Sequence, residues 1–167
     1  PSYSSLFVEM ARIYDRKKQY DSAIKYNQLA LKFSPIDFTA NNNLGSVLLT
    51  AGRYREAIPY FLLAMQYNPN FKYAYLNVAR CYNQLQQYDS AVINYRKLLE
   101  FEPQNLEVIQ ELGTSYFMRQ KYDSAKYYYD IILQNKPNDA NTINNIGAIL
   151  LNTKQYAQAV TYFQKAI

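Results

Sequence analysis

The residue types that most often carry enzyme chemistry are scarce in this chain. It has no histidine and one cysteine, Cys81, so the commonest general base and the commonest metal ligand are missing, and a Cys-based zinc site is excluded. Glu107 and Glu111 are spaced so that a helix would place both carboxylates on one side. Such a pair resembles an acid/base couple, but on an exposed helix it is more often a solvated surface. We therefore expect no catalytic residue, no metal and no cofactor.

A second set of polar residues recurs at fixed places. Asn43, Asn77 and Asn145 are separated by 34 or 68 residues, and Glu9 and Glu111 fill the other two places of the same series. A carboxamide both donates and accepts hydrogen bonds, so a row of them can bind the backbone of an extended peptide without reading its sequence. Alternatively, each carboxamide bonds a neighbouring helix, and the sequence leaves both interpretations open.

Composition limits the classes of partner. The 167 residues are 49% hydrophobic, which is enough for a sizeable core, and the net charge of +5 is not concentrated in one segment. We interpret Arg16-Lys17-Lys18 as solvated surface and expect no nucleic-acid partner. No apolar run has membrane-spanning length, so we expect no membrane contact by these residues. The Asn- and Tyr-rich composition indicates a bacterial source, and the cellular compartment stays open.

A strict period organises the chain. The stretch QYDSA occupies 19–23 and 87–91, with RYREA at 53–57, KYDSA at 121–125 and QYAQA at 155–159, each 34 residues after its predecessor. Such a period is typical of a repeat protein. Three other residue classes keep the same step: the tyrosines, the small residues of the first half-unit and the prolines, which are Tyr20, Tyr54, Tyr88, Tyr122 and Tyr156; Ala11, Gly45, Ala79, Gly113 and Gly147; and Pro1, Pro35, Pro69, Pro103 and Pro137.

Each unit reads as a helical hairpin. Two stretches with helical spacing of apolar residues flank a short polar turn, and the proline ends the second stretch because it cannot continue a helix. Gly or Ala in the first helix lets the two helices approach closely. Asp21, Asp89 and Asp123 stand where a carboxylate can cap the second helix, and Gly52 stands where a left-handed residue is expected.

The residues resemble the tetratricopeptide repeat. The second unit has Leu44-Gly45, Ala57, Phe61 and Pro69, and the fourth has Leu112-Gly113, Tyr116, Ala125, Tyr129 and Pro137, although Asn27 stands where the family usually has an aromatic residue. The resemblance implies an all-α fold, a right-handed superhelical α-solenoid of stacked antiparallel hairpins. We expect a single domain over 1–167, with repeats at about 4–37, 38–71, 72–105, 106–139 and 140–167, the last incomplete.

The resemblance also implies that the first helix of each hairpin lines a concave face. The leading hypothesis is a non-enzymatic protein-interaction scaffold that holds a peptide or protein segment of unknown identity in this groove. Alternatives are an accessory region of a larger enzyme, such as a transferase, and a self-assembly element. The residues expected to bind a peptide are Arg12, Asn43, Asn77, Arg80, Glu111, Phe117 and Asn145.

The ends of the chain suggest a piece of a longer array. Pro1 lies one period before Pro35, and the fifth unit stops at Ile167 within its second helix. Terminal repeats of solenoids need a polar cap. We expect Val160, Phe163 and Ile167 to lie near an uncovered end, and we expect end-to-end self-association there.

Overall fold

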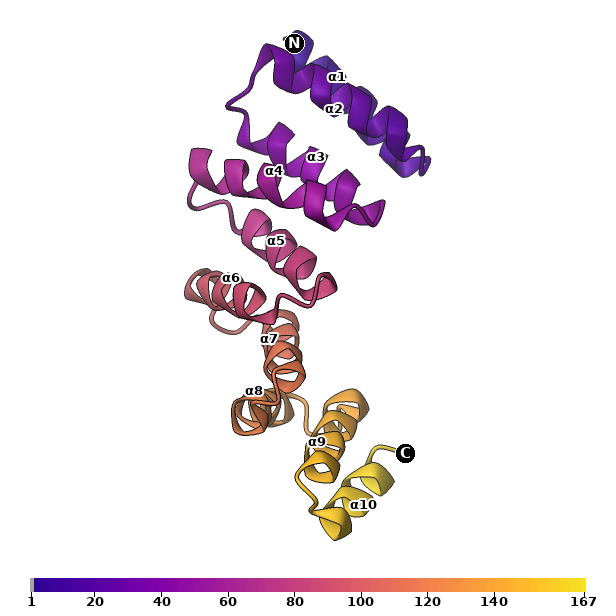
Figure 1. The fold of residues 1–167 in the computed structure, drawn as a ribbon, viewed down its shortest axis with the longest axis vertical. Helices are drawn as coiled ribbons and strands as arrows, with labels where there is room; N and C mark the ends of the chain where they lie inside the picture. Colours follow the sequence, from indigo (N-terminus) through magenta and orange to yellow (C-terminus); the bar gives the residue numbers. More distant parts are fainter. Residues whose placement is uncertain (1) are drawn as a thin grey trace. The chain divides into compact units, whose positions relative to one another are not determined.

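The computed structural model describes residues 2–167, so Pro1 and the expectation attached to it lie outside the described residues. The chain divides into two compact units, Pro1–Gln87 and Tyr88–Ile167. Figure 1 shows the helices in chain order. The first unit contains α1 (Tyr3–Arg16), α2 (Tyr20–Phe33), α3 (Phe38–Thr50), α4 (Tyr54–Tyr67) and α5 (Lys72–Gln84); the second contains α6 (Tyr88–Phe101), α7 (Leu106–Met118), α8 (Tyr122–Asn135), α9 (Ala140–Asn152) and α10 (Tyr156–Lys165).

Within each unit the helices pack in the order of the chain. In the first unit α1 packs on α2 and α3 on α4, and in the second α7 packs on α8 and α9 on α10. Successive hairpins join through the second helix of one and the first helix of the next, as α2 joins α3 and α8 joins α9. Every regular element in residues 2–167 is a helix. The predicted all-α class and α-solenoid of stacked hairpins are confirmed.

The small residues of the first helices make room for rings. A β-carbon added to Gly45 would lie 2.7 Å from Cε1 of Phe61, and one added to Gly147 would lie 2.7 Å from Cε1 of Phe163. Gly113 has the same relation to Tyr129. The predicted close approach is therefore that of a helix backbone to an aromatic ring on the second helix. In the first hairpin the ring position holds Asn27, whose buried Oδ1 has no hydrogen-bond partner.

The turns inside the hairpins share one backbone conformation. Gly52 has a φ of +75°, as its place in the sequence predicts. The residues at the same place in the other four hairpins also have positive φ, between 57° and 62°, although none is glycine: Lys18, Gln86, Gln120 and Lys154. The turn geometry is thus a property of the repeat and not of the residue type.

Helix capping differs from the prediction. Asp21 and Asp123 lie one residue inside α2 and α8, whose N-cap residues, Gln19 and Lys121, make no side-chain cap hydrogen bond. A carboxylate inside the first turn can act only on the helix dipole. Caps occur instead on first helices, where the N-cap residues Ser2, Asp37, Asn105 and Asp139 accept hydrogen bonds from backbone N–H groups.

Each unit has a hydrophobic core that spans adjacent hairpins. In the first unit one cluster joins Ile24 on α2, Leu44 and Val47 on α3, and Phe61 on α4. Cys81 on α5 belongs to the same cluster. In the second unit Ile132 on α8 and Ile146 on α9 share another cluster. Because each hairpin buries its apolar side against the next, the positions left over on the first helices are polar and accessible.

Candidate functional site

Those leftover positions form a surface that we call the first-helix face. It consists of the two series of positions three residues apart on successive first helices. In the first unit its members are Glu9, Arg12, Asn43, Ser46, Asn77 and Arg80; in the second unit they are Glu111, Thr114, Asn145 and Ala148. Arg12 and Glu9 are exposed and the others are half-buried, so every member can be reached by a ligand.

Hydrogen bonds connect two first helices of the first unit. Nδ2 of Asn77 donates to Oδ1 of Asn42 over 3.3 Å and to Oγ of Ser46 over 3.4 Å. Both distances are near the upper limit for a hydrogen bond, so each bond is weak. The sequence left open whether this carboxamide bonds a neighbouring helix or a ligand. Asn77 on α5 bonds the neighbouring helix, α3, and its amide is shared between two acceptors.

Asn43 and Asn145 behave differently from Asn77. Both side chains are half-buried at the same place in their repeats. Within residues 2–167 neither carboxamide makes a hydrogen bond. A carboxamide has two N–H donors and a carbonyl acceptor, and all of them face solvent or a ligand here. These two side chains are therefore the least committed polar groups of the Asn series.

Charged and aromatic groups flank the first-helix face of the first unit. Nη1 of Arg12 and Oε1 of Glu9 form an exposed ion pair with an N–O distance of 2.7 Å. Tyr73 lies one helical turn before Asn77 and is 57% exposed. Its ring packs edge-on against that of Phe71, with the centroids 5.7 Å apart, and Nζ of Lys72 lies 5.7 Å from its centroid. An exposed aromatic ring held by neighbours is a suitable contact for an apolar ligand group.

The second unit presents a more strongly tied face. The hydroxyl of Tyr95 donates to Oε2 of Glu111 over 3.4 Å, and Oγ1 of Thr142 donates to Oε1 of Gln110 over 3.1 Å. Phe117 is half-buried, and its ring packs edge-on against Tyr122 of its own hairpin. Of the two interpretations of Phe117, a ligand pocket or a ring covered by a hairpin, the contacts favour the second.

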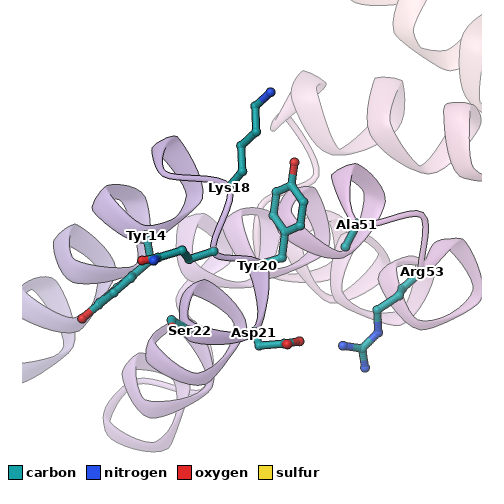
Figure 2. A pocket seen from close by; sticks show the side chains of 8 residues that line it. Tyr14, Lys18, Tyr20, Asp21, Ser22, Ala51 and Arg53 are labelled. Carbon is teal, nitrogen blue, oxygen red and sulfur yellow. The ribbon is translucent and has the colours of Figure 1, made fainter.

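A hollow that the sequence did not predict lies at the turns of the first two hairpins (Figure 2). It has a volume of about 630 Å³. Figure 2 shows the Asp21 carboxylate on the side of the Arg53 guanidinium, and the Lys18 amine pointing away from both. Arg53 is already bound to Glu56 through two hydrogen bonds, of 2.8 and 2.6 Å. Its lining is Tyr14, Lys18, Gln19, Tyr20, Asp21, Ser22, Ala51 and Arg53, so charges of both signs meet there.

The one cysteine is a core residue. Burial raises the pKa of Cys81 to about 12, so its thiol stays protonated and unreactive near neutral pH. Burial also raises the pKa of Tyr129, which packs against Gly113. Residues 2–167 contain no group of three or more Cys, Asp or Glu side chains that could hold a metal ion, and no helix in that range is long and apolar enough to cross a membrane.

Family comparison agrees with the repeat pattern. Two family models described as tetratricopeptide repeat match residues 8–69 and 48–112. The chain belongs to the tetratricopeptide-repeat family. A third family model, described as anaphase-promoting complex, cyclosome, subunit 3, matches residues 84–166 of this tetratricopeptide-repeat chain. No curated protein sequence matches it at a significant level.

Solved structures of MamA share the fold of these tetratricopeptide repeats. A crystal structure of MamA protein has a TM-score of 0.91 at 19% identity, over 98% of this chain and 90% of that one. MamA 41-end from Desulfovibrio magneticus RS-1 has a TM-score of 0.92 at 16% identity, over 99% and 94% of the two chains. Another MamA crystal structure has a TM-score of 0.87 at 20% identity, over 94% and 92%. At these identities the likeness extends to the fold alone.

The predicted binding residues fall into two groups. In the first unit Asn43, Asn77 and Arg80 lie on the adjacent helices α3 and α5, and Arg12 lies on α1. Glu111, Phe117 and Asn145 belong to the second unit, on α7 and α9. Asn42 and Ser46, which bond Asn77, were not among the predicted binding residues. Their helical spacing relative to Asn43 and Asn77 was visible, but pairing across two helices requires the packing of α3 against α5.

Proposed function

We propose that this chain is a protein-interaction scaffold that binds an extended peptide segment on the first-helix faces of its two units. The observation that carries the proposal is the pair of uncommitted carboxamides, Asn43 and Asn145. Each is half-buried, each occupies the same repeat position, and neither has a hydrogen-bond partner within residues 2–167. A peptide backbone supplies the donor and acceptor that such a group lacks.

The neighbouring groups support binding of a backbone. The bonds from Asn77 to Asn42 and Ser46 are 3.3 and 3.4 Å long, so a peptide carbonyl that takes the Asn77 amide replaces weak bonds with a stronger one. Hydrogen bonds to a backbone give affinity without strict sequence selection. Selection then falls to side-chain contacts.

Two groups in the first unit are suited to side-chain contacts. Tyr73 presents an exposed ring one turn before Asn77, and tyrosine is enriched among residues that dominate binding energy. Arg80 lies one turn after Asn77, on the same side of α5. We expect a preferred peptide to carry an apolar residue and an acidic residue on opposite sides of the segment bound by Asn77.

The test begins with peptides selected on the immobilised 167-residue chain from a random phage-displayed library. The affinity of a selected peptide is then measured by isothermal titration calorimetry for the parent, Asn43→Ala and Asn145→Ala. Asn138→Ala is the matched control, because Asn138 is exposed in the loop before α9 and lies off the first-helix face.

We expect each first-helix variant to weaken the peptide it contacts by about 1 kcal/mol, the usual net contribution of one hydrogen bond. The control should bind as the parent does. Unchanged affinity in both first-helix variants, with unchanged melting temperatures, would contradict the proposal.

The other expectations from the sequence stay predictions. Absence of catalysis and of nucleic-acid binding is consistent with an interaction fold, and an accessory role beside an enzyme has no particular residue in its favour. A self-assembly role is favoured by a specific observation, the exposure of Leu6, Met10 and Ile13 on α1.

A further inference from the structure

An apolar stripe on α1 is open to solvent. Leu6, Met10 and Ile13 are 49%, 37% and 53% exposed. Their spacing of four and three residues places them on one side of the helix. This side differs from the first-helix face, which contains Glu9 and Arg12. No residue in the range 2–167 covers the stripe enough to bury it.

The same positions are buried wherever a hairpin precedes the helix. On α3 the equivalents of Leu6, Met10 and Ile13 are Ala40, Leu44 and Val47. All three are at most 3% exposed. The equivalents on the other first helices are at most 3% exposed as well: Ala74, Val78 and Cys81 on α5; Val108, Leu112 and Ser115 on α7; Thr142, Ile146 and Ile149 on α9.

The second helix of the preceding hairpin supplies the cover. In the first unit, where α2 packs on α3, buried Ile24 of α2 lies in one hydrophobic cluster with Leu44 and Val47 of α3. Leu31, seven residues after Ile24 on α2, packs against the same cluster. An interior contact therefore joins positions 24 and 31 of one hairpin to positions 44 and 47 of the next.

The last helix displays the matching half of this contact. Val160 and Ile167 stand four repeats after Ile24 and Leu31. Val160 is 55% exposed, whereas Ile24 is buried, and Ile167 is fully exposed. Phe163, which the sequence also assigned to this end, is instead half-buried against Gly147 inside the hairpin. The end surface is thus formed by Val160 and Ile167.

We propose that α10 of one copy docks on the Leu6–Met10–Ile13 stripe of a second copy. A second copy is the occupant because this chain carries both halves of its own interior contact, at equivalent positions and in the same order along the hairpin. The association continues the contact that joins α2 to α3. It does not depend on peptide binding, because the residues involved lie outside the first-helix face.

The proposed contact has a defined symmetry. It joins two different surfaces, so each dimer keeps one free α1 stripe and one free α10 surface, and growth continues unless a ring closes. A contact between a few helices is small, and small interfaces associate weakly. We therefore expect reversible oligomers whose mean mass rises with concentration.

Sedimentation velocity of the 167-residue chain over about three decades of concentration tests the proposal, since a small interface requires high concentration. Met10→Glu and Val160→Glu should each lower the association constant about tenfold or more, because an unpaired charge is costly to bury. Ile93→Glu is the matched control: Ile93 is 68% exposed on α6, and its variant should associate as the parent does. Ile13→Glu replaces Met10→Glu if the latter does not fold.

Mixing the two end variants gives the sharpest result. Met10→Glu keeps an intact α10 surface and Val160→Glu keeps an intact stripe, so an equimolar mixture should form a heterodimer that grows no further. A parent chain that stays monomeric at the highest concentration overturns the proposal. So does a mixture that stays monomeric while the parent associates, or an association that either end variant leaves unchanged.

Discussion

Gly113 on α7 leaves no room for a side chain, because the ring of Tyr129 on α8 lies against it. A β-carbon at position 113 would be 2.7 Å from Cε1 and 3.0 Å from Cδ1 of that ring. Tyr129 is 1% exposed, so its ring cannot move into solvent. Gly113→Ala should therefore lower the free energy of unfolding by about 1–3 kcal/mol, the usual cost of overpacking, and Gly113→Leu should lower it further. Urea denaturation measures both.

A double-mutant cycle shows whether the ring is the cause. In a Tyr129→Ala background the space opposite Gly113 is empty, and Gly113→Ala should then cost far less than in the parent. Equal cost in both backgrounds would mean that the ring does not set the limit at position 113.

The turn residue Gln120 is held in a conformation that favours glycine. Its φ is +58°, and its side chain is exposed. A left-handed conformation strains a residue with a β-carbon, and the strain exceeds the added entropy of glycine in the unfolded chain. Gln120→Gly should raise the free energy of unfolding by about 0.5–1 kcal/mol. Gly52→Ala, at the equivalent turn with a φ of +75°, should lower it. Opposite signs in thermal denaturation support this account; a loss of stability in both would refute it.

How far the sequence predicts the structure can be judged at these positions. The period locates Gly113 and Tyr129 in the right helices, because packing contacts repeat whenever the hairpins do. The left-handed turns were predicted only at Gly52, since Gln120 and Lys154 carry no sign of unusual backbone geometry. The capping aspartates were misplaced because a one-residue shift along the helix separates an N-cap from a residue inside the first turn.

The candidate site was predictable in outline only. The spacing of Asn43, Asn77 and Asn145 identifies one repeat position, and the family resemblance implies that this position faces a ligand. The difference between Asn77, which bonds Asn42 and Ser46, and the unpartnered Asn43 depends on distances between helices. A sequence pattern does not contain such distances.

Cys81 offers a test of core burial. Burial raises its pKa to about 12, so the thiolate that reacts with disulfide reagents is nearly absent in the native protein at mildly alkaline pH. The native chain should therefore react with Ellman's reagent at a small fraction of the rate seen in concentrated guanidinium. Equal rates in the two conditions would show that α5 does not bury this residue.

Asp139 should make stability depend on pH. Its Oδ1 accepts a hydrogen bond from the backbone N–H of Thr142 over 2.8 Å, and hydrogen bonding to Thr142 lowers the pKa of the carboxyl below 3.8. The stabilisation is complete above the unfolded pKa and disappears as the pH falls through the folded pKa. Asp139→Ala should lower the free energy of unfolding by about 1 kcal/mol at neutral pH, and by less in acid.

Asp139→Asn is the control for this cap. Asparagine caps a helix about as well as aspartate but does not titrate. The Asn variant should keep most of the stability at neutral pH and lose less of it in acid. If the Ala variant matches the parent at every pH, the cap contributes nothing measurable.

The most direct test of binding on the first-helix face is a titration of the ¹⁵N-labelled chain with a selected peptide, followed by two-dimensional NMR of the side-chain amides. We predict that the carboxamide signals of Asn43 or Asn145 shift with peptide concentration, while those of Asn138 and of Asn135, which is bonded to the backbone of its own helix, stay in place. Shifts confined to residues of the second helices or the loops, with Asn43, Asn77 and Asn145 unmoved, would contradict the account.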